Sequence, residues 1–104
     1  MHRNAFKMKL KPGCEIEYKK RHNEIWPELK KLLTEAGISD YSIFLDKKTL
    51  TLFAVQKLSA NNKVVDLPSH PIMKKWWVYM ADIMETNEDH SPIVENLEEI
   101  FHMD

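Results

Sequence analysis

Apolar residues recur with two different periods along this chain, and the order of those periods restricts the folds it can adopt. Residues 4–10 alternate apolar and polar side chains, which is typical of a strand. Residues 14–36 carry apolar side chains at helical spacing and charged ones on the opposite side. Alternation returns in residues 40–58 around a polar turn and predicts a hairpin. A second helical stripe covers residues 71–84. The apolar spacing in 97–103 indicates a last strand, although a helix fits nearly as well.

The predicted order is therefore strand, helix, strand, strand, helix, strand, with a weak helix in the loop 59–69. This order defines the split βαβ, or ferredoxin-like, α+β fold. The chain has 104 residues with only 2 Gly and 5 Pro, and it contains no linker or internal repeat. We therefore expect a single domain over residues 1–104.

The first helical region should not be one continuous helix, because Pro27 lies in its middle. Proline lacks an N–H and crowds the carbonyl four residues earlier, which costs about 3 kcal/mol in a helix interior. It also disfavours helical backbone at the preceding residue, Trp26. The sequence predicts a break near residues 23–26 and a second helix that begins at Pro27 and is capped by Gly37. His22 would then end the first helix, where the helix dipole favours a charged imidazole with a proton to donate.

The charged side of this region contains two acid–base pairs four residues apart with the acid first. They are Glu15 with Lys19 and Glu17 with Arg21. That order is the favourable one for an ion pair along a helix.

Two helices cover only one face of a four-stranded sheet. The alternation of the hairpin leaves Phe44, Phe53 and Val55 on the other face. An exposed apolar face of this size usually marks an interface. Sheet-to-sheet homodimerisation is the prediction that we favour. The alternative is that the C-terminal segment folds over the same face.

Composition excludes several classes of function. The formal net charge is −1, from 15 basic and 16 acidic residues, so no positive field is available for nucleic acid. Cys14 is the only cysteine, which excludes an intrachain disulfide. A single thiol and a charged N-terminus without an apolar leader indicate a cytoplasmic protein. No apolar run approaches the roughly 20 residues needed to cross a membrane.

Several aromatic and polar residues are placed so that they converge in the predicted fold. Tyr18 and His22 are four residues apart on the apolar stripe, so their side chains are neighbours. Tyr41 shares the inner face of its strand, and Trp76 or Trp77 approaches from the second helix. Flat apolar walls with a few hydroxyl and imidazole groups suit a small neutral polyol.

A purely structural reading of the same residues is also open. A single histidine beneath an apolar stripe is more often a hydrogen-bonded core residue, and Tyr18 and Tyr41 fit the edge of a core. Trp76 and Trp77 cannot both be buried in one direction, because adjacent helical residues point about 100° apart. At least one of them needs a pocket, a partner subunit or solvent.

Other chemistries are poorly supported. The five histidines show no spacing typical of metal ligands, and one cysteine cannot build a thiolate site. The chain has no Gly-rich phosphate loop and no nucleophile elbow. We therefore expect an acid–base site without metal or cofactor.

The segments "EYKKRHNEIWPEL", "YSIFLDK", "LFAV" and "WWVYMADIM…N…SP" resemble the L-rhamnose mutarotases nearly end to end. The resemblance implies a small cytoplasmic homodimer of the ferredoxin-like, dimeric α/β-barrel type that interconverts the α and β anomers of L-rhamnose during its catabolism. It also implies that His22 is the proton donor and that the sugar is bound by Tyr18, Tyr41, Trp76 and Trp77. The loop departs from the family pattern, with "NEDHSP" in place of Asn-Pro-Asp-Asn-Ser-Pro. This leaves the roles of Asn87, Glu88 and His90 open.

Mutarotation fits these residues because it needs a positioned acid–base pair and no cofactor. The hypothesis is that protonated His22 donates to the ring oxygen of L-rhamnose or a closely similar deoxy sugar. The base at the anomeric hydroxyl stays open among Tyr18, Tyr41 and water. Two other classes compete: a small oxygenase or haem-handling protein of the same fold, and a sugar-binding module without catalysis.

Overall fold

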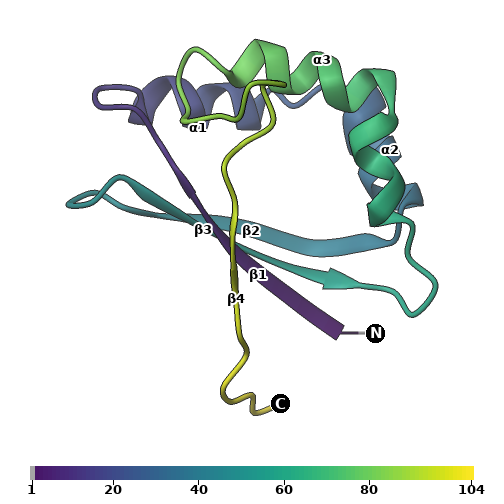
Figure 1. The fold of residues 1–104 in the computed structure, drawn as a ribbon. Coiled ribbons are helices and arrows are strands. Elements are labelled where there is room, and N and C mark those ends of the chain that lie inside the picture. Colours follow the sequence, from purple (N-terminus) through teal and green to yellow (C-terminus); the bar gives the residue numbers. More distant parts are fainter. Residues whose placement is uncertain (1) are drawn as a thin grey trace.

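The computed structural model describes residues 2–104 and confirms the predicted order of elements (Figure 1). The strands are β1 (His2–Lys9), β2 (Ile38–Asp46), β3 (Thr51–Leu58) and β4 (Glu95–Leu97). The helices are α1 (Glu15–Asn23), α2 (Pro27–Glu35) and α3 (Pro71–Met80), with a 3₁₀ helix, η1 (Val64–Ser69), before α3.

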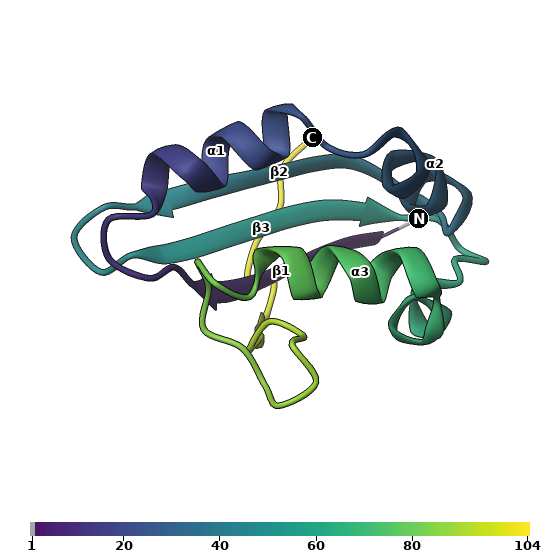
Figure 2. The same ribbon diagram turned by 90° about the horizontal axis from the view of Figure 1, so that it is seen from above.

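The strands form one antiparallel sheet in the order β2-β3-β1-β4. All three α-helices lie on the same face of this sheet (Figure 1). Seen from above, α1 and α3 run along opposite sides of the sheet, and α2 lies near one end (Figure 2). This arrangement is the ferredoxin-like fold expected from the order of periods.

The predicted break in the first helical region is confirmed. Trp26 has an extended backbone, with φ −60° and ψ 130°, and α2 begins at Pro27. The first helical hydrogen bond of α2 runs from the Lys30 N–H to the Trp26 carbonyl over 3.0 Å. Pro27 therefore occupies a position where its missing N–H costs nothing. Gly37 follows the helix with φ +97°, as expected of a residue that ends a helix.

The boundaries of two elements differ from the prediction. α3 ends at Met80 rather than residue 84, because the next residues bind the end of β1 instead. Lys11 donates its N–H to the Ile83 carbonyl over 2.9 Å, and Leu10 pairs with Met84. The weak helix expected over 59–69 is confined to η1.

The last strand was predicted too far along the chain. β4 pairs only with Ala5, Phe6 and Lys7 of β1, and residues 98–104 form no strand. Apolar alternation can mark a strand only where a neighbouring backbone is available to pair with it, and residues 98–104 extend beyond the sheet (Figure 1).

The core lies between the sheet and the helices. Leu10, Leu29 and Leu52 are almost completely buried there. The alternation of β3 sends Leu52 and Ala54 into this core and Phe53 and Val55 to the opposite face, as predicted.

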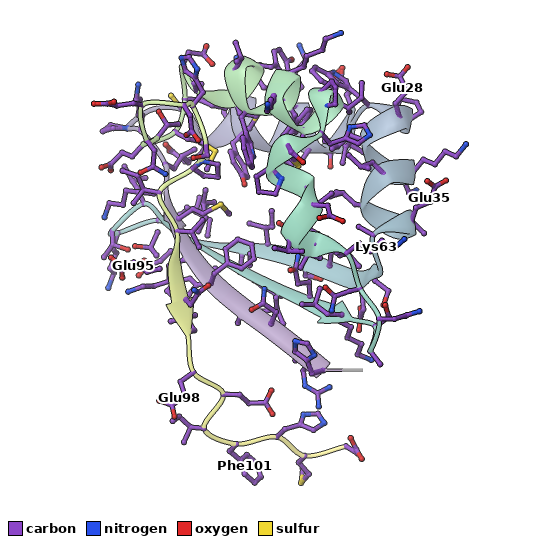
Figure 3. All side chains as sticks on the ribbon, turned by 45° about the vertical axis from the view of Figure 1, so that its right-hand side comes forward. Glu28, Glu35, Lys63, Glu95, Glu98 and Phe101 are labelled. Carbon is purple, nitrogen blue, oxygen red and sulfur yellow. The ribbon has the colours of Figure 1, made fainter. Side chains whose placement is uncertain are left out.

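The helix-free face of the sheet remains apolar and uncovered. Phe44 is 62% exposed and Val55 is 36% exposed. The C-terminal segment does not bury its own apolar residues on this face, since Phe101 is 79% exposed and points away from the rest of the chain (Figure 3). Residues 98–104 run across the helix-free side of the sheet (Figure 2) but leave Phe44 exposed, so the sheet-to-sheet homodimer stays a prediction.

Within residues 2–104, none of the helices is both long and apolar enough to cross a lipid bilayer.

Candidate active site

The side chains of Tyr18 and His22 lie against each other at the end of α1. Their ring centroids are 4.3 Å apart with the planes inclined by 27°. The Nδ1 atom of His22 is 3.1 Å from the carbonyl oxygen of Tyr18. A carbonyl can only accept, so Nδ1 carries the proton of the neutral ring. The Nε2 atom is left to accept or donate a proton toward a ligand.

Trp76 brings the second helix to the same point. Its ring meets His22 edge-on, with centroids 5.5 Å apart and planes at 86°. Trp26 contacts Trp76 at 5.1 Å and Tyr79 at 5.5 Å, which extends the aromatic cluster. The break between α1 and α2 therefore has a packing role that was not predicted. It turns Trp26 toward α3, where the indole supports the wall of the site.

Arg21 fixes α1 to the end of α3. It donates from Nε to Glu17 at 2.8 Å and from Nη1 to the Tyr79 carbonyl at 2.7 Å. Two further bonds reach both oxygens of Asp82, at 2.8 and 3.2 Å. The pair between Glu17 and Arg21 is thus confirmed. This fork holds α1 against α3 one residue before His22.

A cavity of about 1060 Å³ lies between the helices and the sheet, and all five predicted site residues line it. Trp76 is buried in the core, whereas Trp77 is half-buried and lines the cavity. Tyr41 sits at a bulge of β2, beside Asp40 with φ +48°. Ligand pockets usually measure about 300–1000 Å³, so the space is ample for a monosaccharide.

The surroundings of His22 oppose the charged imidazole that the helix end favours. Burial outweighs the other influences and holds the pKa of His22 below its ordinary value of 6.5, although the hydrogen bond to Tyr18 acts in the opposite direction. The imidazole is therefore mainly neutral at neutral pH. With Nδ1 protonated, its Nε2 lone pair faces a ligand as a base rather than as an acid.

Both tyrosines remain protonated hydroxyls. Tyr41 is 39% exposed as a whole residue, but the atoms packed around its hydroxyl desolvate that group and raise the pKa of Tyr41 to about 12. Burial also raises the pKa of Tyr18, and the neighbouring Tyr41 adds to the shift because two phenolates would repel each other. Each hydroxyl can donate a hydrogen bond to a ligand, but neither is a good base at neutral pH.

The cavity is also lined by polar residues that were not assigned from the sequence, among them Gln56, Glu15 and His90. Gln56 is 5% exposed and accepts a hydrogen bond from Asn4 at 3.0 Å. Its position between Ala54 and Leu58 on the inner face of β3 was a visible signal, since a polar residue interrupts a buried face there. His90 lies in the loop of residues 87–92, which departs from the family pattern, and has φ +69°.

Across residues 2–104, no three His, Cys, Asp or Glu side chains are grouped so that they could hold a metal ion. The expectation of a reaction without a cofactor remains a prediction.

The fold and the cavity define a ferredoxin-like α+β protein with a neutral imidazole in an aromatic, hydroxyl-bearing pocket. A model of the L-rhamnose mutarotase family matches residues 3–103. The chain belongs to the L-rhamnose mutarotase family.

Individual L-rhamnose mutarotases are similar to this chain in sequence and in structure. An L-rhamnose mutarotase of Flavobacterium johnsoniae is 61% identical over 98% of this chain and 95% of its own length. One of Phocaeicola vulgatus is 58% identical over the full length of both chains. The crystal structure of an L-rhamnose mutarotase from Formosa agariphila superposes with a TM-score of 0.94, at 53% identity and over all of both chains.

A more distant structure shares the fold alone. A putative antibiotic biosynthesis monooxygenase from Bordetella bronchiseptica has a TM-score of 0.63 at 13% identity, and the match covers 95% of this chain and 96% of that one. Its name gives no support to the oxygenase alternative, because this fold hosts many functions.

Proposed function

We propose that this protein interconverts the α and β anomers of L-rhamnose, or of a closely similar deoxy sugar, with His22 as the proton-transfer residue. The observation that carries the proposal is the free Nε2 of His22 in an aromatic cavity, with Nδ1 fixed by the Tyr18 carbonyl 3.1 Å away. Family membership supplies the identity of the sugar.

The reaction begins with neutral His22. Its Nε2 accepts the proton of the anomeric hydroxyl as the bond between the anomeric carbon and the ring oxygen breaks. The ring oxygen takes a proton from the Tyr18 or Tyr41 hydroxyl, or from water, which gives the open aldehyde. Rotation presents the other face of the carbonyl, and the former ring hydroxyl attacks it. That hydroxyl returns its proton to the tyrosine or water that supplied it, and imidazolium returns its own proton to the new anomeric oxygen. His22 is thus a base during opening and the proton donor during closing.

The aromatic residues hold the sugar during these steps. Trp76 and Trp77 offer flat faces for its C–H bonds, and the hydroxyls of Tyr18 and Tyr41 donate hydrogen bonds to its oxygens. Because both tyrosines are protonated before the ring opens, their hydroxyls can donate hydrogen bonds to the ring oxygen and do not compete for the proton taken by His22.

The decisive experiment is NMR saturation transfer between α- and β-L-rhamnose with catalytic amounts of protein. Wild type should give protein-dependent exchange, and His22→Gln should reduce it about 10²–10⁴-fold, the usual contribution of one acid–base group. A matched control is His70→Asn. His70 caps α3 through the Ile72 N–H, asparagine caps equally well, and this residue does not line the cavity.

A sugar-binding module without catalysis would bind L-rhamnose, but neither wild type nor His22→Gln would raise the exchange rate above that of the sugar alone. Absence of exchange with wild type would therefore remove the assignment.

We also propose a homodimer joined through the helix-free faces of two sheets. The exposed apolar side chains of that face support it, Phe44 above all, together with Ile100, Phe101 and Met103 of the uncovered C-terminal segment. A cytoplasmic location is proposed on the single free thiol, Cys14.

A further inference from the structure

Glu15 places a carboxylate in the wall of the cavity, at the opposite end of α1 from His22. It lines the same space as Tyr18 and His22. Its Oε1 atom is buried and has no hydrogen-bond partner among residues 2–104. No side chain in that part of the chain forms an ion pair with Glu15 either, so the pair expected with Lys19 is not formed.

A buried acceptor without a donor is unusual, because its lost hydration is normally replaced by a hydrogen bond. Glu17, two residues later, satisfies its carboxylate by binding Arg21 at 2.8 Å. The unpaired oxygen of Glu15 therefore marks a place where the cavity is built to receive a hydrogen-bond donor. A neutral polyol supplies such donors through its hydroxyl groups.

The spacing along α1 places this acceptor beyond the reacting end of a sugar. Glu15, Tyr18 and His22 follow each other at intervals of three and four residues, so they share one face of the helix. Seven residues correspond to about 10 Å along a helix. Tyr18 lies between the other two, and its ring is stacked on His22. A pyranose beside Tyr18 can have its anomeric end at His22 and its remaining hydroxyls toward Glu15.

We propose that the Glu15 carboxylate binds hydroxyls of the sugar on the side away from the anomeric carbon and so determines which sugars are accepted. This inference rests on the sugar-binding role proposed above for the same cavity. Glu15 takes part in binding and takes no proton in the reaction. Its loss should therefore raise KM and leave kcat nearly unchanged.

The test compares Glu15→Gln with wild type by calorimetric binding of L-rhamnose and by anomer exchange. The amide has the same shape but lacks the charge, and hydrogen bonds to charged groups are the stronger ones. We expect Kd and KM to rise about tenfold, with kcat within about twofold of wild type. Glu28→Gln is the matched control, because Glu28 is the first-turn acid of α2 and points away from the cavity (Figure 3).

A second variant separates sugar binding from an effect on the helix. Glu15→Asp keeps the negative charge that favours the start of α1 but withdraws the carboxylate by one methylene group. It should weaken binding as Glu15→Gln does if the carboxylate contacts the sugar. Binding at the wild-type level in Glu15→Asp would assign Glu15 to helix stability and overturn the inference.

Monodeoxy analogues of L-rhamnose identify the contact. The analogue that lacks the bound hydroxyl should bind wild type and Glu15→Gln equally, whereas the others should lose about tenfold on substitution. Equal losses for every analogue, or a Kd of Glu15→Gln within about twofold of wild type, would contradict the proposal. Wild type that neither binds nor exchanges L-rhamnose would remove the proposed function and this inference together. Exchange by wild type with an unaffected Glu15→Gln would remove the inference alone.

Discussion

His22 is subject to two opposing influences. Its position at the end of α1 favours the charged ring, and its burial among Tyr18, Trp76 and the cavity wall favours the neutral one. Burial prevails and lowers the pKa of His22, because the charged imidazole loses more hydration than the hydrogen bond to the Tyr18 carbonyl returns. The sequence placed the imidazole beside Tyr18, but the burial that opposes its charged form could not be seen there.

The lowered pKa of His22 predicts the direction in which activity changes with pH. If neutral His22 starts the reaction, the protein-dependent exchange rate should be constant above about pH 6.5 and should fall as the pH drops through the lowered pKa of His22. The measurement is saturation transfer at a series of pH values from about 5 to 8, corrected for exchange without protein.

The opposite profile would support the alternative in which protonated His22 opens the ring. In that case the rate would rise on acidification and fall toward neutral pH. His22→Gln serves as the control, since its residual exchange rate should lack the pH dependence assigned to the imidazole.

Pro27 illustrates how one residue sets the boundary between two elements. It lies at the first position of α2, where no backbone donor is needed. Pro27→Ala should therefore lower the free energy of unfolding by about 0.4–1 kcal/mol, because the more flexible chain gains entropy when unfolded. Urea unfolding at one fixed protein concentration measures this. An increase in stability, as expected on removing proline from a helix interior, would contradict the assigned break.

The connection between α2 and β2 depends on Gly37. Its φ of +97° is unfavourable for any residue with a Cβ, and a Cβ there would meet Ser59 and lie 2.9 Å from the Cβ of Asn62. Gly37→Ala should cost about 1–2 kcal/mol of backbone strain and about 1–3 kcal/mol of overpacking. Urea unfolding again gives the loss.

Gly13→Ala is the matched control for this substitution. Gly13 has φ +79°, but a Cβ there would have no neighbour within 4 Å. It should show the backbone cost alone. Equal losses at the two glycines would mean that the contact of Gly37 with the loop 59–62 contributes nothing.

At the scale of the whole molecule, the exposed sheet face predicts self-association. Phe44 is 62% exposed on that face. Phe44→Asp should shift the sedimentation mass from twice 12.3 kDa toward 12.3 kDa, because a buried unpaired charge opposes the contact. Val65→Asp is the control, since Val65 is 83% exposed on η1 and lies outside this face. Wild type that sediments as a single chain at micromolar concentration would exclude the proposed dimer.

Much of the fold was predictable because its signals are local. The two periods fixed the order of the elements, and Pro27 fixed the break between α1 and α2. The same signals failed at residues 98–104, where apolar alternation has no neighbouring backbone to pair with. The contact between Tyr18 and His22 was predictable because it follows from their spacing along one helix. Trp26 and Glu15 were missed because their roles depend on contacts made, or not made, by distant segments.

By itself the sequence determined the order of the elements and the faces of the helices and strands, since each follows from covalent geometry within a few neighbouring positions. Only the tertiary structure decided that burial lowers the pKa of His22, that the Glu15 carboxylate has an unpaired oxygen and that Phe44 stays exposed on the sheet. These properties depend on how many atoms from remote parts of the chain surround a group. The number of surrounding atoms depends on how the helices pack on the sheet, which local sequence does not specify.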